Sequence, residues 1–221
     1  MRFATACAAA LLVSSAALAQ PVAKFETSMG NFSVLLEDAK APVTVKSFVK
    51  YVKAGHYNNV AIYRIVPGFV VQAGSMKPDD SWKRAGKPIA LETDTGLSNK
   101  RGTIAMARED KPASATTEFF INLADTNAQA LDAKAGAAPN TTGYAVFGSV
   151  YDGMDVIDAI AGAELGGNRG QFPANYPKTP IIIKKVTIID VTPVITPAPA
   201  SPPAAPATPA APAATPTGPT Q

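Results

Sequence analysis

Residues 63–74, YRIVPGFVVQAG, place an arginine and a glutamine inside an otherwise apolar stretch. Arg64 and Gln72 belong to residue types that are rarely buried, and a charge without a partner in apolar surroundings is costly. A guanidinium is a permanent cation whose donors lie in a fixed plane, so Arg64 is suited to bind an electron-rich atom. The structural alternative is that Arg64 pairs with Glu118 across the predicted sheet.

The other reactive residues exclude several mechanisms. The chain has one cysteine, Cys7, in an N-terminal segment that we expect to be removed, and one histidine, His56. Beyond that segment, thiol catalysis and a His/Cys metal site are therefore excluded. His56 follows a predicted helix and is expected at the surface or as a cap. Residues 125–136 do not form a calcium loop, because Ala130 stands where the loop needs glycine and no glutamate closes it. We expect no metal and no cofactor.

Apolar patterning predicts the elements that hold Arg64 and Gln72. A helical period begins near Pro42 and ends at Gly55, and a second short helix is predicted over 153–162. The sequence VPGF at 66–69 has the proline and glycine of a type II turn. Strands are predicted at 22–27, 31–36, 60–66, 68–74, 102–107, 118–124, 144–150 and 180–191. Without βαβ alternation, these strands indicate an antiparallel sheet closed into a barrel, with the helices covering its ends.

The two ends of the chain differ from its body. Residues 1–19 combine Arg2, a short apolar run and the sequence ALA, which is typical of a secretory signal cleaved after Ala19. Residues 192–221 are rich in Pro, Ala and Thr and carry no charge, so we expect a disordered, extended spacer or, alternatively, a ligand for a partner. The domain is predicted at 20–191. These features predict a periplasmic or secreted protein.

Charge and hydropathy limit the partners. The net charge is +3 for 221 residues, and no block of Lys and Arg or basic patch interleaved with aromatic residues occurs. Such a balance does not favour nucleic acid as a partner. After residue 19, no stretch is long and apolar enough to span a membrane.

Four stretches resemble a known family. They are YRIVPGFVVQAG (63–74), NKRGTIAMAR (99–108), TTEFFINLADTNAQALD (116–132) and GYAVFGSVYDGMDVID (143–158). In order and spacing, over about 22–191, the chain resembles the cyclophilin-type peptidyl-prolyl cis–trans isomerases, above all those of the bacterial periplasm. The resemblance implies an eight-stranded antiparallel barrel capped by two helices, a monomer, and rotamase activity on X–Pro bonds of exported proteins that assists their folding. It implies no covalent intermediate and no metal, which agrees with the missing nucleophiles.

The resemblance also implies roles for single residues. Arg64 matches the family's catalytic arginine, and Phe119 and Phe120 alternate, so one faces the core and the other the proline pocket. Gln72 is expected to orient Arg64 and contact the peptide backbone. The positions expected to bind substrate are Phe69, Val70, Gln72, Ala107, Arg108, Glu118, Phe120, Leu131 and Tyr144.

Three positions depart from the family pattern. Glu118 stands where relatives usually have Gln, and we expect its carboxylate to compete for the donors of Arg64 and to favour basic peptides. Ala130 replaces an aromatic residue, which predicts weak cyclosporin binding. Tyr63 replaces the common histidine.

Two other functions remain open at this level. The same groove can serve a non-catalytic proline-peptide binding module or a holdase chaperone, and the Pro-rich tail can be the working part of an interaction protein. The intact set of Arg64, Phe69, Gln72 and Phe120 favours the enzyme.

Overall fold

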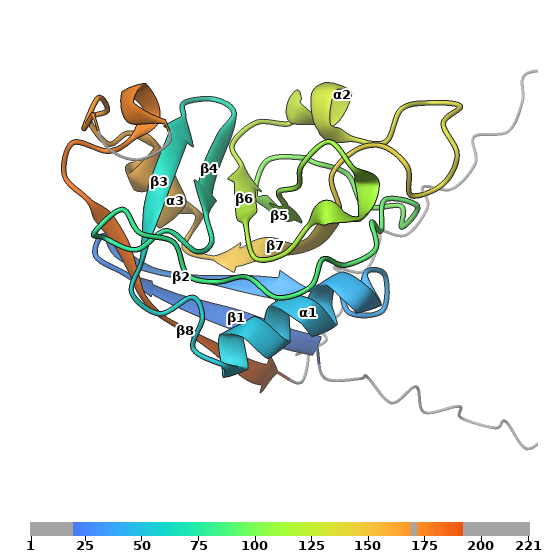
Figure 1. Cartoon of the computed structure of the whole chain (residues 1–221), viewed down its shortest axis with the longest axis horizontal. Helices are drawn as coiled ribbons and strands as arrows, with labels where there is room; N and C mark the ends of the chain where they lie inside the picture. The colour runs from blue at the N-terminus through green and yellow to red at the C-terminus, as the bar shows by residue number, and fades with distance from the viewer. Residues whose placement is uncertain (1–19, 169–171, 192–221) are drawn as a thin grey trace, which may run out of the picture.

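Eight antiparallel strands close into a barrel in this computed structural model, which describes residues 20–168 and 172–191 (Figure 1). The order around the barrel is β1-β2-β7-β5-β6-β4-β3-β8. The strands are β1 (Gln20–Thr27), β2 (Gly30–Leu36), β3 (Val60–Val66), β4 (Val70–Ala73), β5 (Thr103–Met106), β6 (Phe119–Asn122), β7 (Val146–Asp152) and β8 (Ile181–Val191). The predicted eight-stranded antiparallel barrel is confirmed. β1 and β2 form a hairpin in which Thr27 pairs with Gly30.

Three α-helices accompany the barrel: α1 (Pro42–Lys53), α2 (Asn127–Leu131) and α3 (Met154–Ala161). The apolar faces of α1 and α3 join the barrel core, as predicted from their period. The first turn of α1 is bound by Glu92, which accepts hydrogen bonds from the backbone N–H groups of Val43 (3.1 Å) and Thr44 (2.8 Å). The five-residue α2 was not predicted, because one and a half turns are too short to show a helical period.

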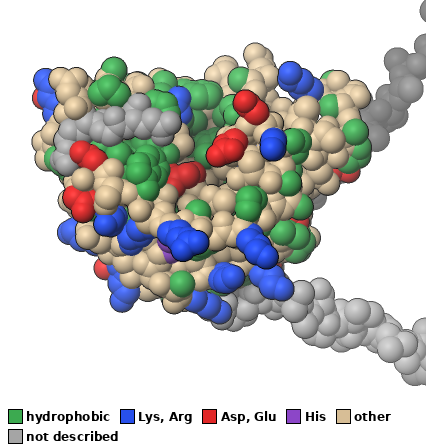
Figure 2. Space-filling model, in the orientation of Figure 1, with side chains coloured by type: hydrophobic (Ala, Val, Ile, Leu, Met, Phe, Trp, Pro, Cys, Tyr) green, Lys and Arg blue, Asp and Glu red, His purple; other side chains and the backbone are tan. Residues whose placement is uncertain are grey.

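The outer side of α1 is basic. Lys46, Lys50 and Lys53 are exposed on this helix, opposite its buried residues. Figure 2 shows basic side chains gathered along this edge of the molecule.

The inner face of the barrel holds a core of aromatic rings. Phe25 stacks on Phe32 at 4.5 Å, and Phe48 of α1 contacts Phe25, Phe119 and Phe147 at 5.1–6.2 Å between ring centroids. Such ring pairs stabilise a core beyond their burial alone. Among the described residues, the interior of the barrel is thus filled by packed side chains.

The outer face of β4, β5 and β6 carries a second apolar cluster. Successive residues of a strand point to opposite faces, so Phe119 enters the core while Phe120 points outward. Val70 and Ala105 lie beside Phe120 on this outer face, and Leu131 and Val146 complete the cluster. Phe119 and Phe120 thus lie on opposite faces of β6, as their alternation predicts.

A β-bulge in β3 interrupts this alternation. Ile62 pairs with Ala73 and Arg64 pairs with Gln72, so Tyr63 is an additional residue with no partner in β4. A bulge of this kind leaves two consecutive side chains on one face. Ile62 and Ile65 belong to the inner core, whereas Tyr63 and Arg64 both lie outside it. The regular alternation of a strand therefore fails at Arg64, the residue to which the predicted chemistry is assigned.

Strand ends differ from the predictions by a few residues. The predicted strand at 68–74 begins at Val70, because Pro67 and Gly68 form the turn: Phe69 N donates to Val66 O (2.9 Å) and Gly68 has φ +71°. These are features of the predicted type II turn. β7 lies two residues later than predicted.

His56 is half-buried, with its ring 5.0 Å from that of Tyr51 and 5.4 Å from that of Tyr57. It is thus less exposed than a surface residue, and it lies outside the pocket described below. Burial, aided by Lys83, lowers its pKa.

Two predictions concern residues outside the described ranges, namely the segments 1–19 and 192–221.

Within residues 20–168 and 172–191, no helix is long and apolar enough to cross a membrane. The same residues contain no cluster of three or more His, Cys, Asp or Glu side chains arranged to hold a metal ion.

Candidate active site

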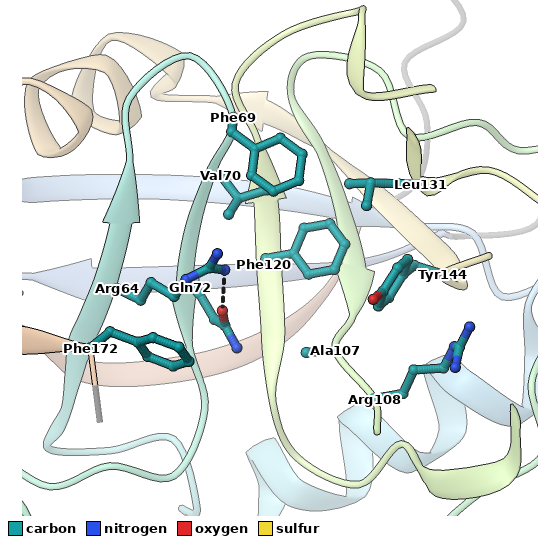
Figure 3. A pocket seen from close by; sticks show the side chains of 10 residues that line it. All are labelled: Arg64, Phe69, Val70, Gln72, Ala107, Arg108, Phe120, Leu131, Tyr144 and Phe172. Atoms are coloured by element: carbon teal, nitrogen blue, oxygen red, sulfur yellow. Dashed lines mark hydrogen bonds between the residues drawn. The ribbon is translucent and has the colours of Figure 1, made fainter. Parts of the chain in front are cut away.

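A cavity of about 290 Å³ lies on the outer face of the barrel, over β3, β4, β5 and β6 (Figure 3). One end of it is apolar and the other carries Arg64 and Gln72. Its lining consists of Arg64, Phe69, Val70, Gln72, Ala107, Arg108, Phe120, Leu131, Tyr144 and Phe172.

The apolar end is built around Phe120. The ring of Phe120 meets that of Tyr144 edge-on at 5.6 Å, and Phe69 and Leu131 close the sides. Phe69 reaches this place because the turn at Pro67 and Gly68 returns the chain beside β3. The result is a concave apolar surface on which a small ring can lose its contact with water.

Arg64 is held at the polar end by two neighbours. Its Nη1 donates to Gln72 Oε1 at 2.9 Å, and the guanidinium carbon lies 5.0 Å from the ring centroid of Phe172. Within the described part of the chain, Arg64 forms no ion pair with a carboxylate. Its charge is therefore available to a ligand and is not neutralised by the protein.

Three buried asparagines fix the walls of the cavity. Asn99 Nδ2 donates to the carbonyls of Leu131 and Tyr144, both at 3.2 Å. Asn127 Nδ2 donates to the carbonyl of Phe69 at 2.7 Å. Asn122 links the other two, since it donates to Asn99 Oδ1 (3.2 Å) and accepts from Asn127 (2.8 Å). Phe69, Leu131 and Tyr144 are thus anchored through their backbone carbonyls, and α2 supplies both Asn127 and Leu131.

Arg108 and Tyr144 form the far rim. The guanidinium carbon of Arg108 lies 5.0 Å from the ring centroid of Tyr144. Arg108 also donates through Nε to Gly143 O (2.8 Å) and through Nη1 to Glu109 O (2.8 Å). These bonds to backbone carbonyls make Arg108 a rigid part of the wall.

Glu118 lies outside this cavity. It lines a neighbouring depression together with Tyr63, Trp82 and Glu109. Its carboxylate accepts hydrogen bonds from Tyr63 Oη (2.8 Å) and Ser75 Oγ. The expectation of direct competition for the donors of Arg64 is therefore corrected, as is the structural alternative of an Arg64–Glu118 pair. The bulge in β3 is the reason, because it places Tyr63 between the two charges.

Burial perturbs the acids of this region. It raises the pKa of Glu118, although the hydrogen bonds from Ser75 and Tyr63 oppose the shift. Burial and the nearby carboxylate of Glu118 also raise the pKa of Tyr63. Tyr63 therefore stays protonated and acts as a donor to Glu118 at neutral pH.

Comparison with known proteins identifies the fold and the family. The sequence profile of the family described as "Cyclophilin type peptidyl-prolyl cis-trans isomerase/CLD" matches residues 22–188. The chain belongs to this family. Its activity is that of a peptidyl-prolyl cis–trans isomerase. The family expectation from the sequence is thereby confirmed.

Individual relatives match over most of their length. The peptidyl-prolyl cis-trans isomerase of Acinetobacter baylyi is 40% identical over 178 residues, which cover 80% of this chain and 90% of that protein. Isomerase B of Escherichia coli is 41% identical over 164 residues, or 74% of this chain and 97% of that protein. A crystal structure of a Cryptosporidium parvum cyclophilin, in the presence of the dipeptide Ala-Pro, shares the fold with a TM-score of 0.61 and 22% identity, covering 77% of this chain and 99% of that one.

The isomerase brings nine of the ten predicted site residues into one cavity. The tenth, Glu118, lines the neighbouring depression, whose wall also includes Gln72, Ala107 and Arg108. Ala130, the position where an aromatic residue was expected, is exposed on α2 and does not line the cavity.

Sequence reasoning missed Phe172. It comes from a Pro-rich stretch, QFPANYP, in which no periodicity distinguishes an aromatic residue of the site from one of the core. The three asparagines were missed as well, since their alignment depends on the strand order. Tyr63 was noted only as a replacement, and its contact with Gln72 (2.8 Å) follows from the bulge.

Proposed function

We propose that Arg64 is the electrostatic catalyst of this isomerase. Rotation about a peptide bond meets a barrier of about 18–20 kcal/mol, which arises from amide resonance. At the top of the barrier the proline nitrogen is pyramidal and holds a localised lone pair. A guanidinium donor aimed at this nitrogen binds the twisted state more strongly than the planar one, and such differential binding is what lowers a barrier.

The single observation that supports this role is the position of the guanidinium of Arg64. It lies at the rim of an apolar cavity, carries no ion-pair partner among the described residues, and is fixed by Gln72 at 2.9 Å. Phe69, Phe120 and Leu131 are placed to hold a proline ring beside it. Val70, Ala107, Arg108 and Tyr144 line the same cavity, which supports a role for them in contacting the rest of the peptide. The low local dielectric strengthens the interaction of Arg64 with the nitrogen.

The isomerase is tested on a capped Ala-Pro peptide with a spectroscopic assay that needs no protease. We expect Arg64→Ala to lose about two decades of kcat/KM, or about 2.7 kcal/mol of transition-state stabilisation. Arg64→Lys keeps the charge without the planar fork and is expected to recover only a small part. If Arg64→Ala keeps the parent's rate while remaining folded, the proposed role of Arg64 is wrong. If the parent binds proline peptides without turning them over, the chain is a binding module.

The cellular setting is also a proposal. The pattern of residues 1–19 supports export, so that the isomerase assists folding of exported proteins as a monomer in the periplasm or outside the cell. Fractionation of a Gram-negative host that expresses the whole chain tests this, beside a chain without residues 2–19. Equal distribution of both between cytoplasm and periplasm would contradict it. Weak cyclosporin binding stays a prediction, which nanomolar affinity in a titration would disprove.

A further inference from the structure

Glu118 is a buried carboxylate that the mechanism above does not use. It lies on the segment that enters β6, directly before Phe119 and Phe120. Gly74 makes room for it, since a Cβ added to Gly74 would lie 2.5 Å from the carboxylate. A buried carboxylate is costly unless its oxygens accept hydrogen bonds, and both oxygens of Glu118 do so, from Tyr63 and Ser75.

Two side chains, Gln72 and Tyr63, connect Glu118 with the guanidinium of Arg64. Arg64 Nη1 donates to Gln72 Oε1 at 2.9 Å, Gln72 Nε2 donates to Tyr63 Oη at 2.8 Å, and Tyr63 Oη donates to Glu118 Oε2 at 2.8 Å. We call these four residues the relay. Every bond in it donates in the same direction, from the cation toward the anion.

Arg64 and Glu118, at the two ends of the relay, determine which groups of Gln72 and Tyr63 donate and which accept. A guanidinium can only donate and an ionised carboxylate can only accept, whereas an amide and a phenol do both. Because Tyr63 donates to Glu118, its oxygen is left to accept from Gln72. The amide of Gln72 must then turn its oxygen to Arg64. The opposite orientation would direct an N–H group at the guanidinium, and the bond that fixes Arg64 would be lost.

We propose that Glu118 and Tyr63 are positioning residues of the isomerase, which act through Gln72 to hold the guanidinium of Arg64 in its catalytic orientation. The proposal rests on the role of Arg64 stated above. It replaces the expectation of competition between Glu118 and Arg64 with an indirect, supportive contact. Hydrogen bonds in such a chain polarise one another, so the charge at one end strengthens the bond at the other.

Protonation of Glu118 changes the hydrogen bonding of the relay. The protonated carboxyl can donate to Tyr63, which removes the constraint on the orientation of Gln72. The charged and titratable groups near Glu118 are Tyr57 and Tyr63 from the β3 side and Arg108 and Glu109 from the segment after β5. Arg64 lies beyond Tyr63. Glu109 is the other carboxylate lining this depression, and it is exposed. Burial of Glu118 brings its titration closer to neutral pH than that of an exposed glutamate.

The reaction itself transfers no proton, so an acid limb in the rate profile must come from the protein. The profile of kcat/KM is measured between about pH 4.5 and 8 on a capped peptide without ionisable side chains, with circular dichroism to verify folding at each pH. For the parent we expect kcat/KM to fall about three- to tenfold toward acid, the size of one lost hydrogen bond. Glu118→Gln should remove this limb. A flat parent profile, or an unchanged limb in Glu118→Gln with a folded protein, would overturn the proposal.

Tyr63→Phe tests the middle of the relay. It removes one hydroxyl and keeps the ring that packs against Trp82 (5.3 Å) and Phe172 (6.2 Å). We expect kcat to fall about three- to tenfold with KM unchanged, because the site is less ordered but equally apolar. Tyr57→Phe is the matched control: it removes a buried hydroxyl that donates to Thr117 O at 3.1 Å, outside the relay. Its activity should equal that of the parent.

A second readout separates positioning from a general loss of stability. In the parent, the two side-chain amide protons of Gln72 should give well-separated, narrow signals by NMR, and these should merge or broaden in Tyr63→Phe but not in Tyr57→Phe. Unchanged Gln72 signals in Tyr63→Phe would overturn the relay. Arg64→Ala distinguishes the two proposals: full activity in that variant refutes the role of Arg64 itself, whereas its inactivity together with a fully active Tyr63→Phe refutes only the relay.

Discussion

Phe119 and Phe120 are neighbours in β6 with the same side chain and opposite surroundings, so a pair of leucine substitutions should separate stability from catalysis. Phe119 is 2% exposed and packs in the barrel core, edge-on against the rings of Phe25 (5.8 Å), Phe48 (6.1 Å) and Tyr57 (5.5 Å). Phe120 is 5% exposed on the cavity side and meets only the ring of Tyr144 among the described residues (5.6 Å).

The ring contacts give the size of the two effects. An edge-on ring pair contributes about 0.5–1.5 kcal/mol beyond burial, so Phe119→Leu should lower the free energy of unfolding by about 2–3 kcal/mol and Phe120→Leu by about 1 kcal/mol. For a domain of this size, one kcal/mol changes Tm by about 2–4 °C. We therefore expect Phe119→Leu to melt about 5–10 °C lower and Phe120→Leu about 2–4 °C lower.

Activity should follow the opposite order. Phe120→Leu removes the flat surface that we propose for the proline ring, and we expect kcat/KM to fall about tenfold, the effect of about 1.4 kcal/mol. Phe119→Leu should keep kcat/KM within about twofold of the parent, because its side chain never reaches the cavity. Thermal unfolding followed by circular dichroism tests the predicted changes in Tm. The protease-free assay, at a temperature where both variants are folded, tests the predicted changes in kcat/KM. If Phe119→Leu is the less active variant, the assignment of the two faces is wrong.

Three further predictions follow from the same contacts. Asn99→Ala removes the side-chain donor to Tyr144 O and one of the two donors to Leu131 O, which keeps the backbone N–H of Tyr144, so urea unfolding should show a loss of about 2–4 kcal/mol and kinetics a raised KM; an unchanged KM would contradict the role of this residue. Because burial raises the pKa of Glu118 in the folded state, the protonated form is favoured by folding, and this stability is lost as pH rises through the folded pKa. Urea unfolding should therefore show Glu118→Gln gaining stability over the parent from about pH 4 toward neutral, and a difference that shrinks over this range would refute the reasoning. Phe172→Ala removes the ring beneath Arg64 and should lower kcat/KM about threefold, with Phe172→Trp restoring it; equal activity of all three forms would show that the ring does not position Arg64.

Most elements could be predicted from local patterns. The strand at 60–66 matches its prediction at both ends, and α1 begins at Pro42 as expected from the position of the proline. The turn at Pro67 and Gly68 was predictable because its geometry demands those two residue types. By contrast, α2 is too short to show a period, and the end of each strand depends on where its neighbour stops providing hydrogen bonds.

Some residues of the site could likewise be predicted from the sequence, and others could not. The motifs around Arg64, Gln72 and Phe120 are continuous in sequence, so resemblance to a family locates them. Phe172 and the three asparagines come from separate segments, and only the closed barrel brings them to the cavity. The expectation for Glu118 was wrong because it assumed direct contact with Arg64 between facing strands. In the structure the hydroxyl of Tyr63 lies between Glu118 and Gln72, the residue that binds Arg64.

The sequence by itself predicted a closed antiparallel barrel, and it indicated an arginine beside aromatic residues as the candidate functional centre. Alternation, turn residues and the types of side chain present are local properties, and they can be read along the chain. The tertiary structure alone decided how the charges of the site are connected. One additional residue in β3 rotates Tyr63 to the outer face, and this places a phenol between the cation of Arg64 and the anion of Glu118. A bulge arises from the register of two strands against their partners, which no single segment specifies.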